Sequence, residues 1–318
     1  MTLFITRRLP EPALSAIPAD LAWQMWPEAG VPIPRVELLR AVADARALVA
    51  LVSERVDAEL LAAAPSLRVV ANMAVGVDNI DLAACRARGV IVTNTPDVLT
   101  ETTADLAWAL LLAAARRVVE GQKLIGAGGW GAWHPLFMTG QDVHGATLGV
   151  IGAGRIGGAV LRRGAGFGMR LLYHNRRPSA ELEAVTGAAY RDLAALMAES
   201  DHVVVCAPLT AETRGLVGAR ELSLMKPTSV FVNVARGPVV DEAALVAALR
   251  AGRPWAAGLD VFEREPIAAD HPLLALPNVV ATPHIGSASV QTRVAMARLA
   301  VANALAVLRG DPPSTPVA

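Results

Sequence analysis

Residues 147–158 read TLGVIGAGRIGG, and this stretch decides the fold. The apolar run 148–151 predicts a short β-strand, and the residues after Gly157 have the composition of a helix. A strand, a glycine-rich turn and a helix in this order are the fingerprint of dinucleotide binding. Gly152 suits the tight turn, Gly154 lets the backbone approach a pyrophosphate, and Gly157 lets the helix pack closely on the strand. A purely structural turn is the alternative for the glycines taken alone.

The fingerprint lies in mid-chain, so a first domain must precede it, and 318 residues suit about two domains. Short apolar runs alternate with helical stretches on both sides of it, a pattern typical of parallel sheets with crossover helices. A final helix, expected at residues 289–308, completes the first domain. We therefore predict an α/β protein with two Rossmann-like domains, each a doubly wound parallel sheet. The predicted domains are a discontinuous substrate-binding domain, residues 1–98 and 287–318, which flanks a dinucleotide-binding domain, residues 99–286.

Overall composition excludes several kinds of partner. The 29 basic and 29 acidic residues give a net charge of zero at pH 7, so the chain has no electrostatic footprint for nucleic acid or an anionic membrane. The longest apolar helical segment, residues 106–115, is too short to span a bilayer, and the N-terminus has no signal-peptide pattern. The two cysteines, Cys85 and Cys206, have no metal-ligand spacing. We expect a cytoplasmic protein without a metal site, whose substrate is a small molecule.

The stretch after the first domain predicts a surface for a second copy of the chain. Residues 102–119 are expected to form one long helix, which is apolar nearly all round and therefore buried at a domain junction or a subunit interface. Residues 126–139 follow with Trp130, Trp133 and His134, and they lack clear periodicity. Exposed tryptophans need cover. We interpret this segment as an arm that packs on a second subunit, which predicts a homodimer.

The residues that follow the next predicted strand bear on the choice of cofactor. About 20 residues after the glycine turn, an acidic residue would hold the ribose 2′-hydroxyl of NAD. The sequence instead reads Asn175-Arg176-Arg177, and two guanidinium groups suit a 2′-phosphate. We predict that NADP(H) is the preferred cofactor, with NAD(H) as the second choice. Two ordinary surface arginines are the alternative interpretation.

Charged residues at strand ends point to the substrate. Ligands of doubly wound sheets bind beyond the carboxyl ends of the strands. Arg236 stands just outside an apolar strand, where a cation is costly to bury unless it meets an anion, so a carboxylate-bearing ligand is favoured over a structural salt bridge. Glu265 and His284 follow in positions that allow them to converge on the same cleft. The remaining histidines have loop-like or polar surroundings and are interpreted as ordinary: His134, His144, His174, His202 and His271.

Five motifs occur in order along the chain and together carry a family resemblance. They are VGVD at 75–78, GAGRIG at 152–157, NVARG at 233–237, GLDVF at 258–262 with Glu265-Pro266, and PHIGS at 283–287. In these motifs the chain resembles the D-isomer-specific 2-hydroxyacid dehydrogenase family, strongly from about residue 71 onward and weakly before it. Within the family it is most similar to glyoxylate/hydroxypyruvate reductases, in the segments 94–99, 133–135 and 271–274.

The resemblance implies an activity and a role for each site residue. The activity is NAD(P)H-dependent reduction of a small 2-keto acid, glyoxylate or hydroxypyruvate, to glycolate or D-glycerate. Arg236 would bind and polarise the substrate, His284 would donate the proton, and Glu265 would hydrogen-bond His284 and favour its charged form. The implied substrate-binding residues are Val75 and Gly76 through their N–H groups, Arg236, Ser287 and, from the arm, Trp133. The predicted cofactor contacts are Gly152, Gly154, Arg155, Ile156 and Gly157 at the pyrophosphate, Asp260 at the nicotinamide amide, and Asn175, Arg176, Arg177, Ala207, Pro208, Thr213, Val234, Ala235, His284 and Gly286 around them.

Other functions on the same fold are alternatives. A dehydrogenase for 3-phosphoglycerate or D-lactate is the nearest, and a non-catalytic, nucleotide-sensing protein like the corepressors with this fold is another. The complete set of Arg236, Glu265 and His284 favours turnover over sensing. Formate dehydrogenases replace the glutamate that matches Glu265, so formate oxidation is disfavoured, whereas phosphite oxidation stays open. The sequence does not decide which 2-keto acid is preferred.

Overall fold

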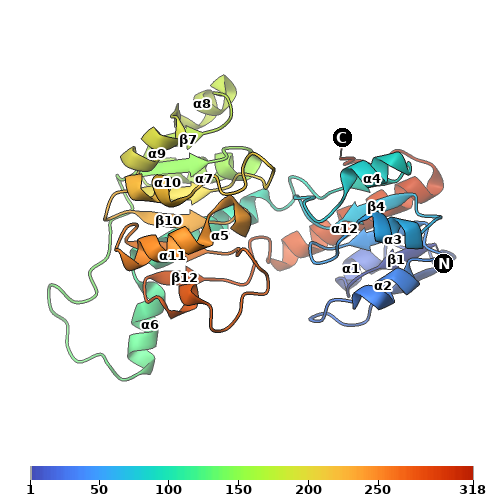
Figure 1. Ribbon diagram of the computed structural model, residues 1–318, viewed down its shortest axis with the longest axis horizontal. Coiled ribbons are helices and arrows are strands. Elements are labelled where there is room, and N and C mark those ends of the chain that lie inside the picture. Colours follow the sequence, from blue (N-terminus) through green and yellow to red (C-terminus); the bar gives the residue numbers. More distant parts are fainter. Residues whose placement is uncertain (1, 318) are drawn as a thin grey trace. The chain divides into compact units, whose positions relative to one another are not determined.

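The computed structural model describes residues 2–317, and the chain divides into two compact units. Unit 1 consists of Met1–Leu99 and Ser287–Ala318, and unit 2 consists of Thr100–Gly286. Each unit is a parallel β-sheet with helices on both faces (Figure 1). The predicted α/β class with two parallel, Rossmann-like sheets is therefore confirmed. Among residues 2–317, none of the helices has both the length and the apolar composition needed to cross a membrane.

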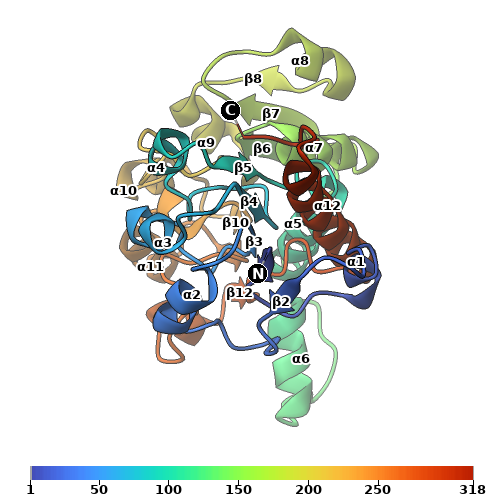
Figure 2. The same cartoon turned by 90° about the vertical axis from the view of Figure 1, so that its right-hand side faces the viewer.

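Unit 1 is built on five parallel strands in the order β2-β1-β3-β4-β5. The strands are β1 (Leu3–Ile5), β2 (Trp23–Met25), β3 (Ala47–Ala50), β4 (Val69–Asn72) and β5 (Ile91–Thr93). Figure 2 shows one helical layer on each side of these strands. The layers are α2 (Arg35–Ala41), α3 (Ala58–Ala63) and α4 (Leu82–Ala87) on one side, and α1 (Glu11–Leu14) with α12 (Val290–Arg309) on the other. Because α12 packs on β3, β4 and α1, the last segment of the chain shares a core with the first.

Aspartate side chains set where two helices of unit 1 begin. Asp57 accepts a hydrogen bond from the Leu60 N–H ahead of α3, and Asp81 accepts one from the Ala84 N–H ahead of α4. Each bond satisfies an N–H group that has no partner within its own helix. The helices then bury apolar side chains such as Leu60 and Cys85 against the sheet.

Unit 2 is built on seven parallel strands in the order β12-β11-β10-β9-β6-β7-β8. The strands are β6 (Thr147–Ile151), β7 (Arg170–His174), β8 (Ala189–Tyr190), β9 (His202–Val205), β10 (Val230–Asn233), β11 (Ala256–Leu259) and β12 (Val279–Ala281). One face carries α5 (Thr100–Ala115) and α7 (Arg155–Gly166), and the other carries α9 (Leu193–Glu199), α10 (Ala219–Leu224) and α11 (Glu242–Arg250). The smaller elements are α8 (Ala180–Thr186) and the 3₁₀ turns η1 (Gly237–Val239) and η2 (Pro272–Ala275). The strand order reverses between β6 and β9, and ligands of doubly wound sheets bind at such a switch point.

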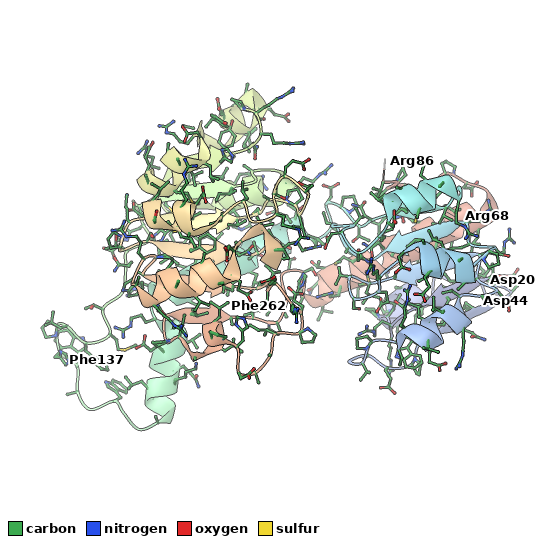
Figure 3. The ribbon with its side chains drawn as sticks, viewed as in Figure 1. Asp20, Asp44, Arg68, Arg86, Phe137 and Phe262 are labelled. Carbon is green, nitrogen blue, oxygen red and sulfur yellow. The ribbon has the colours of Figure 1, made fainter. Side chains whose placement is uncertain are left out.

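The helix predicted at residues 102–119 is two helices in the structure. α5 ends at Ala115, Arg117 takes a left-handed conformation with a φ of 54°, and α6 (Val118–Gly126) follows. Arg117 also forms an ion pair with Glu120, at 2.6 Å, within the first turn of α6. Half of α5 is buried, whereas every residue of α6 is at least partly exposed. Figures 1 and 2 show α6 and the segment after it projecting away from the sheet of unit 2, and Figure 3 labels Phe137 on that segment.

The interpretation of His202 as a residue in loop-like or polar surroundings is wrong. This histidine lies in β9, and only 1% of it is exposed. Its Nε2 lies 3.0 Å from the Asp142 carbonyl oxygen, and burial lowers the pKa of the imidazole. The preceding Asp201 gives the sequence a polar appearance, but the strand starts one residue later.

Candidate active site

The glycine turn lies at the switch point of the sheet in unit 2. Gly152 has a φ of +87°, and a Cβ there would lie 2.4 Å from the backbone nitrogen of Ala207 after β9. A Cβ on Gly157 would lie 2.5 Å from the carbonyl oxygen of Gly152, so α7 packs directly on the end of β6. A Cβ on Gly154 would meet no atom within 4 Å, so the backbone is approachable there. This geometry fits a pyrophosphate at the N-terminus of α7, next to Arg155 and Ile156.

The segment after β7 supports the glycine turn and presents two cations. Asn175 Oδ1 accepts a hydrogen bond from the Ala153 N–H at 2.7 Å, and its Nδ2 donates to the Ala153 carbonyl oxygen at 3.3 Å. Arg176 and Arg177 are exposed, and neither forms an ion pair with any residue in the range 2–317. A hydrogen bond to a neighbouring threonine and the charge of Arg176 lower the pKa of the Glu212 carboxyl. The two arginines are therefore accessible to an anion.

Ala207, Pro208 and Thr213 lie in the turn that follows β9. The Thr213 hydroxyl donates to the Pro208 carbonyl oxygen at 2.5 Å and accepts from the Thr210 N–H at 2.8 Å. This turn lies beside the glycine turn because Gly152 contacts Ala207. The predicted cofactor contacts that follow β6, β7 and β9 thus gather at one edge of the sheet.

Asn233, the last residue of β10, shapes the turn that carries Arg236. Its buried amide accepts a hydrogen bond from the Ala235 N–H at 3.0 Å and donates one to the Arg236 carbonyl oxygen at 3.1 Å. A Cβ on the next residue, Gly237, would lie 1.9 Å from the carbonyl carbon of Phe262. The turn after β10 is therefore in direct contact with the segment after β11.

Asp260, the first residue after β11, fixes the turn after β12. It is 1% exposed, and its carboxylate accepts hydrogen bonds from the Thr282 hydroxyl at 2.7 Å and from the N–H groups of Ile285 and Gly286, both at 2.8 Å. Its carbonyl oxygen accepts the His284 N–H at 2.9 Å. Burial raises the pKa of the Asp260 carboxyl, although these hydrogen bonds favour its ionised form. The turn gives His284 a left-handed conformation, with a φ of 52°.

His284 and Glu265 form a hydrogen-bonded pair, with 2.6 Å between Nδ1 and Oε2. The other carboxylate oxygen of Glu265 accepts the Phe262 N–H at 3.0 Å. Burial disfavours the ionised carboxylate, but the hydrogen bond and charge of His284, together with the charge of Arg236, lower the pKa of Glu265 overall. Because Nδ1 is bound to the carboxylate, Nε2 is the ring nitrogen that can exchange a proton with a ligand. Arg236, Glu265 and His284 therefore gather at one edge of the sheet in unit 2.

The predicted substrate-binding residues outside this group lie in three places. Val75 and Gly76 follow β4 in unit 1, and Ser287 begins the second segment of that unit. Trp133 belongs to the projecting segment after α6 and is 79% exposed. Within unit 2, the predicted cofactor and catalytic residues thus lie in the turns at one edge of the sheet, whereas Trp133 lies apart from them on the projecting segment.

Several residues that shape the site were missed in the sequence. They are Asn72, Asn94, Asn233 and Thr282. Each of them is the last residue of a strand or the first residue after one, which is the signal that the sequence offered. The part of the chain that the structure describes holds no group of three His, Cys, Asp or Glu residues that is suited to a metal ion.

Comparison with known protein sequences gives one consistent family. The family model described as D-isomer specific 2-hydroxyacid dehydrogenase, NAD binding domain, matches residues 108–286. A glyoxylate reductase of Thermococcus gammatolerans is 50% identical to this chain over 317 residues, which cover 98% of this chain and 94% of that protein.

Solved structures agree with the sequence comparison. The crystal structure of a Thermus thermophilus protein has a TM-score of 0.93 and 47% identity, and the match covers all of both chains. An NADPH-dependent glyoxylate/hydroxypyruvate reductase of Sinorhizobium meliloti, in complex with NADP and malonate, has a TM-score of 0.85 and 37% identity. That match covers 100% of this chain and 96% of the other.

Proposed function

This chain belongs to the D-isomer-specific 2-hydroxyacid dehydrogenase family, and from that premise we propose that it reduces glyoxylate or hydroxypyruvate to the D-2-hydroxy acid with a nicotinamide cofactor. One observation carries the proposal. His284 and Glu265 are hydrogen-bonded at 2.6 Å, and they follow two strands of the sheet that also carries the glycine turn at its switch point. The names of two relatives, glyoxylate reductase and glyoxylate/hydroxypyruvate reductase, support the choice of substrate.

Reduction of a 2-keto acid needs a hydride, a proton and a group that holds the carboxylate. A nicotinamide cofactor, which the turn formed by Gly152, Gly154 and Gly157 would hold, would supply the hydride when bound. His284 delivers its Nε2 proton to the carbonyl oxygen, and Glu265 holds the imidazole ring through Nδ1. Arg236 binds and polarises the substrate. The carbon has then gained a hydride and the oxygen a proton, so the product is the 2-hydroxy acid.

We assign cofactor binding to unit 2 and the binding of the substrate carboxylate to unit 1. In this assignment the N–H groups of Val75 and Gly76 hold the substrate carboxylate, and Ser287 adds to the same site. Trp133, which is 79% exposed, reaches the substrate site of the partner subunit in a homodimer. The exposed tryptophan and the projecting segment that carries it support this role.

We propose that NADP(H) is the preferred cofactor, because Arg176 and Arg177 are exposed and a related reductase binds NADP. Replacement of both arginines by alanine should lower kcat/KM for NADPH at least about tenfold, since charge-assisted hydrogen bonds to the 2′-phosphate are lost. The value for NADH should change less than about twofold, because NADH has no 2′-phosphate. Arg220→Ala, at another exposed arginine of unit 2, is the matched control. An unchanged ratio of the two values in the double variant would contradict the assignment.

Initial rates of cofactor oxidation test the proposed function directly. Glyoxylate, hydroxypyruvate and pyruvate are each supplied with NADPH and with NADH. Fast turnover of the first two with NADPH is the expected result. Turnover of pyruvate alone would move the assignment to a D-lactate dehydrogenase. No turnover of any of the three, in protein that binds cofactor, would contradict the proposed reduction of small 2-keto acids.

A further inference from the structure

Three consecutive carbonyl groups in the loop after β4 are each held by a hydrogen bond. The Ala74 carbonyl oxygen accepts from the Thr95 N–H at 2.8 Å. The Val75 carbonyl oxygen accepts from the side chain of Asn94 at 2.9 Å. The Gly76 carbonyl oxygen accepts from the side chain of Asn72 at 2.8 Å. All donors and acceptors belong to unit 1.

These hydrogen bonds determine where the neighbouring N–H groups point. A trans peptide group is planar, so the C=O of one residue and the N–H of the next point in opposite directions. The carbonyls of Ala74 and Val75 both point toward residues 94–95, and the N–H groups of Val75 and Gly76 therefore both point away from them. Neither N–H donates a hydrogen bond to any residue in the described range 2–317. Two successive N–H groups on one side of the backbone form a concavity that suits an anion.

Hydrogen bonds to the backbone of Asn94 restrict the orientation of its side chain. The Asn94 N–H donates to the Thr315 carbonyl oxygen at 3.2 Å, and the Asn94 carbonyl oxygen accepts from the Thr315 hydroxyl at 2.6 Å. The same hydroxyl accepts a hydrogen bond at 2.8 Å from Asn303, which is buried in α12. Asn94 is thus held on both sides by the C-terminal segment, which restricts the direction of its amide.

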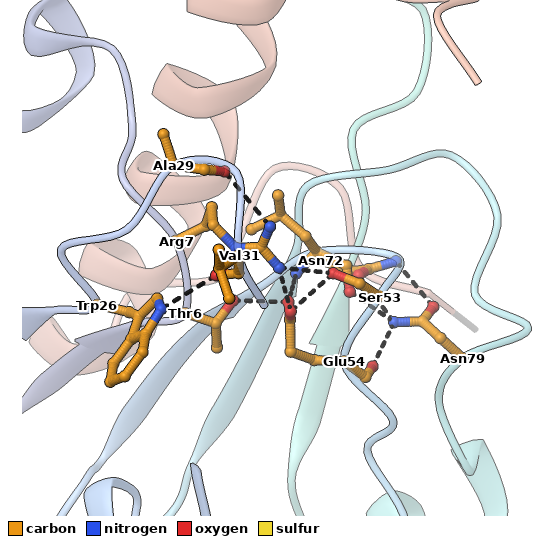
Figure 4. Close-up of polar contacts among 10 residues, drawn as sticks. Thr6, Arg7, Trp26, Ala29, Val31, Ser53, Glu54, Asn72 and Asn79 are labelled. Atoms are coloured by element: carbon orange, nitrogen blue, oxygen red, sulfur yellow. Dashed lines mark hydrogen bonds and ion pairs between the residues drawn. The ribbon is translucent and has the colours of Figure 1, made fainter. Parts of the chain in front are cut away.

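A buried network supports the loop from the other side, as Figure 4 shows. Glu54 is 3% exposed, and its carboxylate is bound by Arg7 at 3.0 Å and by the Thr6 hydroxyl at 2.7 Å. The Glu54 carbonyl oxygen accepts from the side chain of Asn79 at 3.0 Å, and the Asn79 amide contacts that of Asn72 at 3.3 and 3.4 Å. Asn72, the donor to the Gly76 carbonyl, therefore has a fixed position.

We propose that Asn94 is a positioning residue for the substrate carboxylate: its amide holds the Val75 carbonyl and so directs the Gly76 N–H toward the carboxylate. This inference rests on the proposed function, which supplies a carboxylate substrate. Asn94 does not touch the substrate in this account. Asn94 acts by orienting the peptide group between Val75 and Gly76. The Thr95 N–H orients the preceding peptide group, and with it the Val75 N–H, through its hydrogen bond to the Ala74 carbonyl.

Asn94→Leu tests the inference, because leucine has nearly the size of asparagine but no N–H donor. The KM for glyoxylate should rise about tenfold, equivalent to about 1.4 kcal/mol, whereas kcat and the KM for NADPH should change less than about twofold. The Kd of oxamate, an unreactive analogue of a 2-keto acid, should rise by the same factor in the NADPH-bound enzyme. Asn94→Asp, which also lacks the donor, should weaken oxamate binding at least as much.

The matched control is Asn278→Leu. Asn278 is half-buried like Asn94 and donates one hydrogen bond from its amide to a backbone carbonyl, that of Trp255 at 2.8 Å, but it lies in unit 2. This variant should keep the wild-type KM for glyoxylate and the wild-type Kd for oxamate. Circular dichroism checks that every variant is folded.

The outcomes separate the inference from the proposed function. If the wild type reduces glyoxylate and both Asn94 variants keep its KM and oxamate Kd, the inference is overturned and the function stands. If Asn278→Leu loses as much affinity as Asn94→Leu, the effect is general and the inference is also overturned. If the wild type neither reduces a 2-keto acid nor binds oxamate, the proposed function fails and the inference fails with it.

Discussion

Glu265 is the residue through which the pH dependence of the site can be tested. Its carboxylate lies 2.6 Å from Nδ1 of His284, and its lowered pKa shows that the ionised form is favoured there. A carboxylate at this distance holds the imidazole in one orientation, which the proposed proton transfer requires. Glu265→Gln removes the ionised partner of the ring at every pH, so kcat/KM for glyoxylate should fall at least about tenfold over the pH range in which the wild-type carboxylate is ionised.

The measurement for Glu265→Gln is kcat/KM for glyoxylate as a function of pH at saturating cofactor. Glu263→Gln, at an exposed residue of the same segment, is the control and should keep the wild-type profile. A Glu265→Gln profile that coincides with the wild type would remove Glu265 from the proton-transfer step.

His202 predicts a different pH effect, on stability. Nε2 bonds to the Asp142 carbonyl, Nδ1 is buried without a partner among the described residues, and burial lowers the pKa. The unfolded chain, with an ordinary histidine pKa of about 6.5, therefore binds the proton more readily than the folded protein. Stability that is present above that pH is lost as the pH falls through it, at up to about 1.4 kcal/mol per pH unit.

His202→Gln keeps a donor for the Asp142 carbonyl but does not titrate. Its urea-unfolding free energy should therefore fall less between pH 7 and pH 5 than that of the wild type. His144→Gln, at an exposed loop histidine, should show the wild-type loss. Equal losses in the wild type and in His202→Gln would mean that His202 is not the titrating group.

The charged residues of the site could be predicted from the sequence better than the polar residues whose hydrogen bonds fix the turns that carry them. Arg236 and His284 could be identified because each stands in a motif just after an apolar strand. The roles of Asn233 and Thr282 could not be predicted, because their partners come from turns that are distant in sequence or are set by the exact path of the backbone.

At the scale of elements, the contact of Gly237 with the segment after β11 is the most sensitive to substitution. A Cβ on this first residue of η1 would lie 1.9 Å from the Phe262 carbonyl carbon and 2.3 Å from the Glu263 nitrogen. Gly237→Ala must therefore separate the turn that carries Arg236 from the segment that carries Glu265. We expect a loss of about 3 kcal/mol in unfolding free energy, together with a fall in kcat of tenfold or more.

Gly166→Ala is the control for Gly237→Ala. A Cβ at this position of α7 meets no atom within 4 Å, and alanine favours a helix. It should leave kcat unchanged and the protein no less stable. Wild-type activity and melting temperature in Gly237→Ala would show that the two segments separate without cost.

The errors at this scale have local causes. Arg116 and Arg117 suit the last turn of a helix, and no glycine or proline marks the point where Arg117 breaks the predicted helix 102–119. The edge strands β2 and β8 contain no fully buried residue, so neither shows the apolar run that marks the inner strands. The inner strands could be predicted because they are short runs of buried, mostly apolar residues, as in β3, β9 and β10.

At the scale of the whole molecule, α6 and the projecting segment after it predict a homodimer. Large apolar side chains are exposed along both, and monomeric proteins rarely expose such a group of side chains. The exposed residues are Val118 at 57%, Ile125 at 61%, Trp130 at 61%, Trp133 at 79% and Leu136 at 82%. Light scattering after size-exclusion chromatography should give about twice the 33.2 kDa of one chain.

Trp130→Ser with Leu136→Ser should shift the protein toward the monomer, because each change removes about 2 kcal/mol of apolar burial at the interface. Val185→Ser, at a valine of α8 that is 65% exposed, should leave the mass unchanged. A wild-type protein with the mass of one chain at micromolar concentration would contradict the homodimer.

The contacts of Asp260 have a mechanical consequence for the two-unit chain. Unit 2 ends at Gly286, whose N–H is bound by the same buried carboxylate that fixes the turn around His284. A rotation of the backbone beyond Gly286 therefore leaves the 2.6 Å distance between the His284 ring and the Glu265 carboxylate unchanged.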